Sequence, residues 1–379
     1  MTSGLVRAAG ALTVATALAG CGAGTAASST SVAASSPPRL QPQLVMAGPD
    51  SGLLVWRSGS VSVLLATTDG FRTVTNATPP AVPTDGGLLL ARSGSHHVLV
   101  GVLPTGALSV SPVLLGDGTP TGWSGGQLPG VLTDRPEAVA FQGKALWALL
   151  GSGSSTELVT AMAAEGPWQV AASASSLDPS QRLRLTGVRW TDATQGWLSG
   201  TAPAGQTVLF RQGAGGWRPV PLAAPQGTAA ALQEAASAPC GTGGDLVDLV
   251  TTRPSSGGPG TAVVERTVDG GTSWRTGAPV ALPAGDPVWA CSAGRVWLAV
   301  PDGSAARLLA STNGGQAWRD EGTAPGPVTD LAITGADTGY AVTGEGTAAR
   351  LWSVSASGQS FAPVTLPEWV AQLGVGGES

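Results

Sequence analysis

Two eight-residue stretches of the chain share one pattern at a spacing that few folds can use. Residues 267–274 read TVDGGTSW and residues 311–318 read STNGGQAW, so Thr267 and Ser311 are 44 positions apart. Both have a small hydroxyl residue, a short polar residue two positions later, two glycines and a final tryptophan. A period of roughly 40–50 residues suits one four-stranded propeller blade, and a β-sandwich would not need a repeat. The spacing therefore favours a propeller.

Weaker copies and a second recurring element extend this repetition over most of the chain. TTDGFRTV (67–74) and VSASGQSF (354–361) keep part of the pattern. The second element is an aromatic residue among alternating apolar residues, just after a turn, at Trp56, Trp147, Trp197, Trp297 and Tyr340. The alternation predicts strands, which we expect to be the inner strands of the blades, and the Gly and Asx residues predict hairpins.

Counting one such unit at a time gives about seven. They cover residues 44–80, 81–132, 137–173, 182–222, 232–280, 286–322 and 327–367. The sequence thus predicts an all-β fold, a single propeller over 43–368. Seven blades of four-stranded antiparallel sheets fit best, with six or eight left open.

The composition agrees with an all-β chain and argues against some partners. Charged residues are 11% of the chain, against about 25% in typical soluble proteins. With 56 glycines and 29 prolines, a mainly helical fold is disfavoured. No run of basic residues is present, so we expect no nucleic-acid partner.

The N-terminus has a pattern of its own. Arg7 precedes an apolar run from Ala8 to Leu18, which is too short to span a bilayer and ends in Leu18-Ala19-Gly20-Cys21. This resembles the lipobox of bacterial lipoprotein signal peptides. The resemblance implies removal of residues 1–20, a diacylglyceryl group on Cys21, and attachment to the extracytoplasmic face of the cell membrane. Residues 21–42 then form a Gly-, Ala-, Ser- and Pro-rich linker that we expect to be disordered.

Two further cysteines, Cys240 and Cys291, are expected to form a disulfide in an oxidising compartment. A metal pair is less favoured, because no histidine lies near either, and a catalytic thiol is less favoured still. The two histidines, His96 and His97, would point to opposite faces of a strand. We therefore expect no metal and no cofactor.

The stretch TVDGGTSW resembles the Asp-box (BNR) repeat through Thr267, Asp269, Gly271, Ser273 and Trp274. Ser311, Gly315 and Trp318 match it in the next copy, where Asn313 and Ala317 depart from it. With the Gly-Trp strands, the chain resembles WD40/YVTN/BNR-like propellers of the photosystem-assembly-factor, sortilin and sialidase groups. The resemblance implies that each hairpin joins the outer two strands of a blade, away from the central channel, and marks the fold rather than a catalytic site.

Members of this group mostly bind or assemble other molecules, so we expect a non-catalytic cell-surface protein that binds a protein, peptide or glycan, as a monomer. The alternative is a glycoside hydrolase, because sialidases also use Asp-box propellers. A sialidase needs three arginines from separate blades and a Tyr nucleophile activated by a Glu. Here Arg182, Arg184 and Arg189 lie close together in sequence, and the only tyrosine, Tyr340, takes the place of a core tryptophan.

Four residues fall outside both repeated positions: Trp123, Trp190, Trp289 and Asp286. If they lie in connecting loops, they are candidates for a ligand surface, including a sugar-binding one. Residues 367–379 are expected to begin with a short docking turn and to end in a loose tail, and the C-terminal tail is counted from 369 to 379.

Overall fold

The computed structural model describes residues 44–373, apart from 59–60, 81, 83–86, 94–95, 103–111, 117–122, 129–134, 153–154, 179–181, 192–193, 204–206, 223–227, 234–245, 255–257, 284, 293 and 356–359. These residues form seven antiparallel sheets of consecutive strands, one sheet per blade. The predicted all-β propeller is confirmed, and each observed sheet falls within a few residues of a predicted unit.

The first three blades are built from residues 44–173. Blade 1 contains β1 (Leu44–Met46), β2 (Gly52–Ser58), β3 (Val61–Thr67) and β4 (Thr75–Asn76). Blade 2 contains β5 (Gly87–Ser93), β6 (His96–Val102), β7 (Pro112–Gly116) and β8 (Trp123–Gln127). Blade 3 contains β9 (Arg135–Gln142), β10 (Ala145–Ser152), β11 (Ser155–Ala161) and β12 (Gln169–Ser173), and is followed by α1 (Ala174–Leu177).

Four further blades complete the ring. Blade 4 contains β13 (Arg184–Trp190), β14 (Gly196–Thr201), β15 (Thr207–Gly213) and β16 (Gly216–Val220). Blade 5 contains β17 (Thr228–Gln233), β18 (Leu246–Pro254), β19 (Gly260–Thr267) and β20 (Arg275–Thr276), with β21 (Val280–Leu282) also paired to β19.

Blade 6 contains β22 (Val288–Ser292), β23 (Arg295–Asp302), β24 (Ala305–Ser311) and β25 (Arg319–Ala324). Blade 7 contains β26 (Val328–Ile333), β27 (Thr338–Thr343), β28 (Arg350–Ser355) and β29 (Ser360–Pro363), with a 3-10 turn, η1 (Gly346–Ala348), before β28. The short helix α2 (Glu368–Ala371) follows blade 7.

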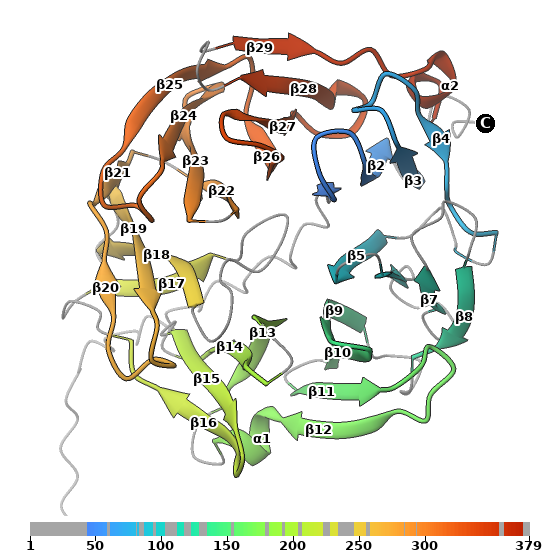
Figure 1. Cartoon of the computed structure of the whole chain (residues 1–379). Coiled ribbons are helices and arrows are strands. Elements are labelled where there is room, and N and C mark those ends of the chain that lie inside the picture. The colour runs from blue at the N-terminus through green and yellow to red at the C-terminus, as the bar shows by residue number, and fades with distance from the viewer. Residues whose placement is uncertain are drawn as a thin grey trace, which may run out of the picture. The chain divides into compact units, whose positions relative to one another are not determined.

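The first strand of each blade lies on the inside of the ring (Figure 1). Strand β1 contacts β5 and β26, β9 contacts β5 and β13, and β22 contacts β26. The fourth strands, from β4 round to β29, lie at the periphery. This corrects one expectation: the recurring aromatic residues are on the second strands, as Trp56 in β2 and Trp297 in β23 show, and not on the inner ones.

The hydrophobic core is divided among the junctions between blades. Among the described residues each of the seven junctions has its own cluster of buried side chains. A sheet that packs on both faces needs apolar residues on both sides, and β2 and β3 of blade 1 show this most clearly. In β2 and β3 only Arg57 and Val61 are not fully buried.

The segment after the last blade packs against the propeller, where a short docking turn was expected. Helix α2 begins at residue 368, and Val370 is 1% exposed. Trp369 and Leu373 also pack against the cluster between blades 7 and 1. Residues 369–373 are therefore part of the packed structure.

Candidate functional site

The hairpin at Thr267 joins β19 to β20, the third and fourth strands of blade 5, and it is held by its own side chains. The Thr267 hydroxyl donates to Asp269 Oδ1 (2.8 Å) and accepts from the backbone N–H of Gly271 (2.7 Å). The Asp269 carboxylate also accepts from the backbone N–H (2.9 Å) and the hydroxyl (2.6 Å) of Ser273. These bonds favour the charged carboxylate and lower the pKa of Asp269 to about 2.

The copy at Ser311 keeps this frame with different atoms. Asn313 Oδ1 accepts from the Ser311 hydroxyl (2.9 Å) and from the backbone N–H of Ala317 (3.0 Å). The N–H of Gly315 donates to the Ser311 hydroxyl (2.8 Å). Asn313 thus accepts the same hydrogen bonds as Asp269 but carries no charge. Ala317 stands where the other copy has Ser273, and this hairpin lacks the bond of that hydroxyl.

Each hairpin also contacts the preceding blade. The Trp274 ring lies 6.3 Å from the Trp197 ring of blade 4, at 62°. Gly271 has φ +85°, and a Cβ there would overlap the Val220 side chain of blade 4. In blade 6, Trp318 Nε1 donates to the carbonyl oxygen of Ala278 (3.0 Å). The polar side chains of these turns form hydrogen bonds within their own hairpins, and the tryptophans contact the preceding blade. The hairpins therefore have a structural role in joining blades.

The ligand-surface candidates separate into two kinds. Trp190 is in β13 and 5% exposed, with its ring 4.9 Å from that of Trp147, and Trp289 is in β22 and 1% exposed. Their prediction as loop residues is wrong, because both lie in first strands whose side chains fill a junction between blades: Trp190 that between blades 3 and 4, and Trp289 that between blades 5 and 6. Trp123 begins β8 and packs, partly buried, against the cluster between blades 1 and 2. Asp286 alone is an exposed loop residue.

The predicted cysteine sites are only partly covered by the structure. Cys291 lies in β22 and is disulfide-bonded. Cys240 and Cys21 lie outside the described residues. The Cys240–Cys291 pairing and the lipidation of Cys21 stay predictions.

An ion pair on the inner strands is the clearest candidate functional site. Arg184 Nη2 in β13 lies 2.6 Å from Glu137 Oε1 in β9, and the two side chains are 36% and 12% exposed. Next to Arg184, the N–H of Leu185 donates to the Thr156 hydroxyl of blade 3 (2.8 Å). Arg182, just before β13, is exposed. The site thus has two guanidinium groups at the start of β13: that of Arg184, which is paired with Glu137, and that of the exposed Arg182.

This site was only partly visible in the sequence. Arg182 and Arg184 stood out as a cluster with Arg189, and β13 does carry Arg184 and Arg189 on one strand. Glu137 was missed, because it is 47 positions away and belongs to another blade. No local pattern could have joined them.

Among the described residues, Tyr340, the candidate nucleophile for glycoside hydrolysis, and the arginines of β13 lie in different blades. The Tyr340 hydroxyl lies 3.1 Å from the carbonyl oxygen of Gly70 and 3.4 Å from that of Pro49, between blades 7 and 1. Burial raises its pKa, and the charges of Asp50 and Asp69 add to this. Tyr340 is in β27, and Glu345 follows the far end of that strand. Within the described residues, no group of three or more His, Cys, Asp or Glu could hold a metal ion.

Comparisons with known proteins agree with the propeller. No protein-family model and no curated protein matches the chain. Among solved structures, YCF48 from Cyanidioschyzon merolae is 16% identical, with a TM-score of 0.52, over 83% of this chain and 94% of that one. A putative 6-phosphogluconolactonase from Bacteroides fragilis is 11% identical, with a TM-score of 0.51, over 84% and 94%.

A third similar structure comes from an analysis of two prolyl endopeptidases. It is 13% identical, with a TM-score of 0.55, over 86% of this chain and 50% of that one. The chain therefore spans half the length of that protein. At these identities the similarity shows the fold alone. In the part of the chain that the structure describes, no helix has the length and apolar character needed to cross a bilayer.

Proposed function

We propose that this protein is a non-catalytic, lipid-anchored propeller that binds a protein, peptide or glycan at the outer face of the cell membrane. The anchor rests on the sequence Leu18-Ala19-Gly20-Cys21 and its resemblance to a lipobox. Two acyl chains would hold the protein stably on a membrane. The binding role rests on the propeller and on its inner-strand ion pair.

One observation carries the binding role: Arg184 and Glu137, from neighbouring blades, meet on the inner strands, and the Arg184 side chain is 36% exposed. Arginine presents several donors in a planar fork, which suits carboxylates and the oxygens of sugars or peptides. With Arg182 exposed beside it, the site supplies a positive edge next to a carboxylate. A ligand with an acidic group and a neighbouring hydroxyl or amide fits this pattern.

The glycoside hydrolase alternative has less support. Its candidate nucleophile, Tyr340, is 7% exposed, and its candidate arginines share one strand and one neighbouring loop. A carboxylate clamp that reaches a substrate from several sides needs arginines from separate blades. In this structure Tyr340 packs between blades 7 and 1, and Arg184 is paired with Glu137.

Two variants of the full chain, compared with the natural chain, test the binding role. Crosslinking in cells, followed by purification and mass spectrometry, is done with the natural chain, Arg182→Glu and Arg275→Glu. Arg275 is an exposed arginine of the outer strand β20 and serves as the matched control. We expect a partner that is recovered with the natural chain and Arg275→Glu but lost with Arg182→Glu. Equal recovery with all three would overturn the site.

Two further measurements test the anchor and the alternative. Intact-mass analysis of the membrane-extracted protein should show a diacylglyceryl adduct that Cys21→Ser removes. A glycoside-hydrolysis panel should show no turnover. Hydrolysis that is abolished by Tyr340→Phe would replace the binding proposal with the enzymatic one.

A further inference from the structure

The junction between blade 7 and blade 1 differs from every other junction in how it is made. Along the chain, each blade is linked to the next by a covalent connection, as residues 325–327 link β25 to β26. Blades 7 and 1 hold the two ends of the ring. In the described residues each sheet is built from consecutive strands, so blades 7 and 1 exchange none.

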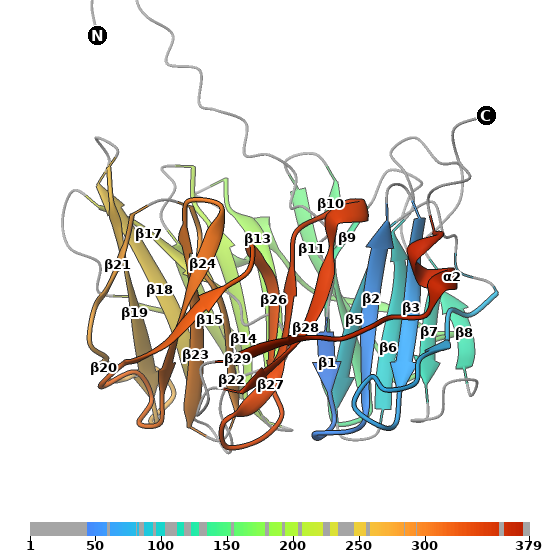
Figure 2. The ribbon, with the colours of Figure 1, turned by 90° about the horizontal axis from the view of Figure 1, so that it is seen from above.

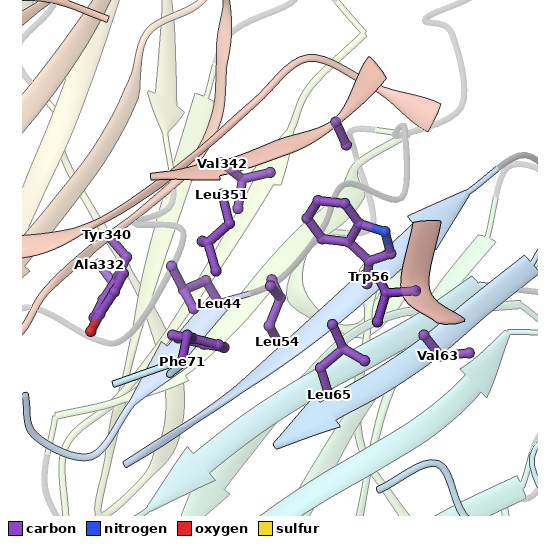
Figure 3. Close-up of a cluster of buried hydrophobic side chains, with 12 residues drawn as sticks. Leu44, Leu54, Trp56, Val63, Leu65, Phe71, Ala332, Tyr340, Val342 and Leu351 are labelled. Carbon is purple, nitrogen blue, oxygen red and sulfur yellow. The ribbon is translucent and has the colours of Figure 1, made fainter. Parts of the chain in front are cut away.

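Non-covalent contacts close the ring instead. The backbone N–H of Leu44, the first residue of β1, donates to Asp330 Oδ2 of β26 (2.6 Å), and Asp330 is 1% exposed. Tyr340 of blade 7 packs edge-on against Phe71 of blade 1, with ring centroids 5.1 Å apart. Figure 3 shows the shared cluster, in which Leu44 and Leu54 face Val342 and Leu351.

The segment after β29 adds a third layer to this closure. The N–H of Val364 donates to the carbonyl oxygen of Leu351 (2.9 Å), so the segment leaves blade 7 in contact with it. It then runs to α2, which lies beside the strands of blade 1 in both views (Figures 1 and 2). Leu366, Val370 and Leu373 pack against the cluster that the two blades share.

We propose that residues 364–373 are a strap that holds the ring closed, and that releasing the strap opens the ring between blades 7 and 1 alone. The strap continues blade 7 covalently and contacts the apolar cluster on the blade 1 side. The strap therefore connects blade 7 to blade 1 by non-covalent packing, where no loop joins the two blades covalently. Because β1 begins at this junction, release would also free the first strand of the propeller.

Hydrogen exchange of two adjacent variants of the full chain tests this proposal. Val370→Asp places a charge at a buried position of α2, whereas Ala371→Asp places the same charge at an exposed position of the same helix. Burial of an unpaired charge disfavours the docked helix. We expect Val370→Asp to raise exchange in β1, β2 and β27 by roughly tenfold or more, and exchange in β14 and β23 to stay unchanged.

The control and a milder variant complete the test. Ala371→Asp should leave exchange in all of these strands as in the natural chain. If Val370→Asp abolishes folding, Val370→Ala is measured, and we expect a smaller rise in the same three strands. Unchanged exchange in β1 and β2, or an equal rise in β14 and β23, overturns the proposal.

Discussion

Two junctions, between blades 4 and 5 and between blades 7 and 1, are packed by the same type of hairpin. In each, an aromatic side chain of the hairpin contacts an aromatic side chain of the preceding blade, but the residue that supplies it differs. In both hairpins a threonine hydroxyl donates to the aspartate and accepts from the N–H at position five: Thr267 to Asp269, and Thr67 to Asp69. At the first junction position five is Gly271 and the aromatic residue is Trp274, at position eight. At the second, position five is Phe71, with φ 63°.

The difference lies in where the aromatic ring comes from. Trp274 reaches Trp197 from the end of its hairpin, while Phe71 reaches Tyr340 from the middle of its own. A left-handed conformation is costly for phenylalanine, at roughly 1–2 kcal/mol. Blade 1 keeps it because the ring is 1% exposed and fills the junction that no chain connection bridges. This type of hairpin can thus carry its aromatic residue at position five, as Phe71, or at position eight, as Trp274.

The largest effect is expected from Gly271→Phe, which gives blade 5 the residue of blade 1. The Cβ would overlap Val220, and the left-handed backbone adds strain, so we expect a loss of about 4 kcal/mol or more in the free energy of unfolding. Gly294→Phe is the control: it has φ +81° with open space around its Cβ, and should cost only about 1–2 kcal/mol. Denaturant unfolding measures both, and equal losses would contradict the steric argument.

The reverse change, Phe71→Gly, should be smaller. Removal of a buried phenylalanine costs about 3–5 kcal/mol, and relief of the left-handed strain returns about 1–2 kcal/mol. We expect a net loss of about 1–4 kcal/mol by thermal or denaturant unfolding. Adding Val74→Trp to this variant moves the ring to position eight, as in blade 5, and should recover part of the loss. If Val74→Trp recovers nothing, the two positions are not equivalent.

A third comparison concerns the buried hydroxyl that both hairpins share. Thr267→Val removes the acceptor of the Gly271 N–H, which leaves a buried donor unsatisfied at a cost of about 1–3 kcal/mol. Thr272→Val, at an exposed position of the same turn, removes a bond from its hydroxyl to the carbonyl oxygen of Asp269 (3.1 Å) that water can replace, and should change the free energy of unfolding by less than about 0.5 kcal/mol. Similar values for the two variants would show that the hydroxyl frame is not what holds the hairpin.

The smallest effect is expected from acid. The pKa of Asp269 is lowered to about 2 in the folded protein, so its stabilisation is present above the ordinary value of 3.8. That stabilisation is lost as the pH falls from 3.8 through about 2. The unfolding temperature of Asp269→Asn should therefore fall less over this range than that of the natural chain. A parallel fall in both would refute the assignment.

Asp330 contributes to pH dependence with the opposite sign. Burial raises its pKa, and the N–H groups of Leu44 and Leu331 only partly oppose this. Its contribution is fully present below 3.8 and is lost as the pH rises through its folded pKa. Asp330 is present in both the natural chain and Asp269→Asn, so its effect cancels when the unfolding temperatures of the two proteins are subtracted at each pH. The hairpin at Asn313 has no carboxylate at the matching position and is a neutral reference within the molecule.

The sequence was informative where a pattern is local. The spacing of the hairpins predicted the blade boundaries, because each hairpin is built by side chains at most four residues apart, as Thr267 and Gly271 are. It was misleading for Trp190 and Trp289, whose burial depends on side chains of other strands. The Arg184–Glu137 pair and the bond between Leu44 and Asp330 span 47 and 286 positions, so no local pattern could predict them.

The position of the single tyrosine has a practical consequence. The chain has thirteen tryptophans, which sit at many places around the ring, but one phenol, that of Tyr340, at the meeting point of its two ends. Ionisation of a phenol changes its near-ultraviolet absorption, and the pKa of this one is raised by burial in the closed ring. A spectrophotometric alkaline titration of Tyr340 therefore reports, without a label, whether the junction between blades 7 and 1 is closed. A pKa close to that of free tyrosine indicates an open ring.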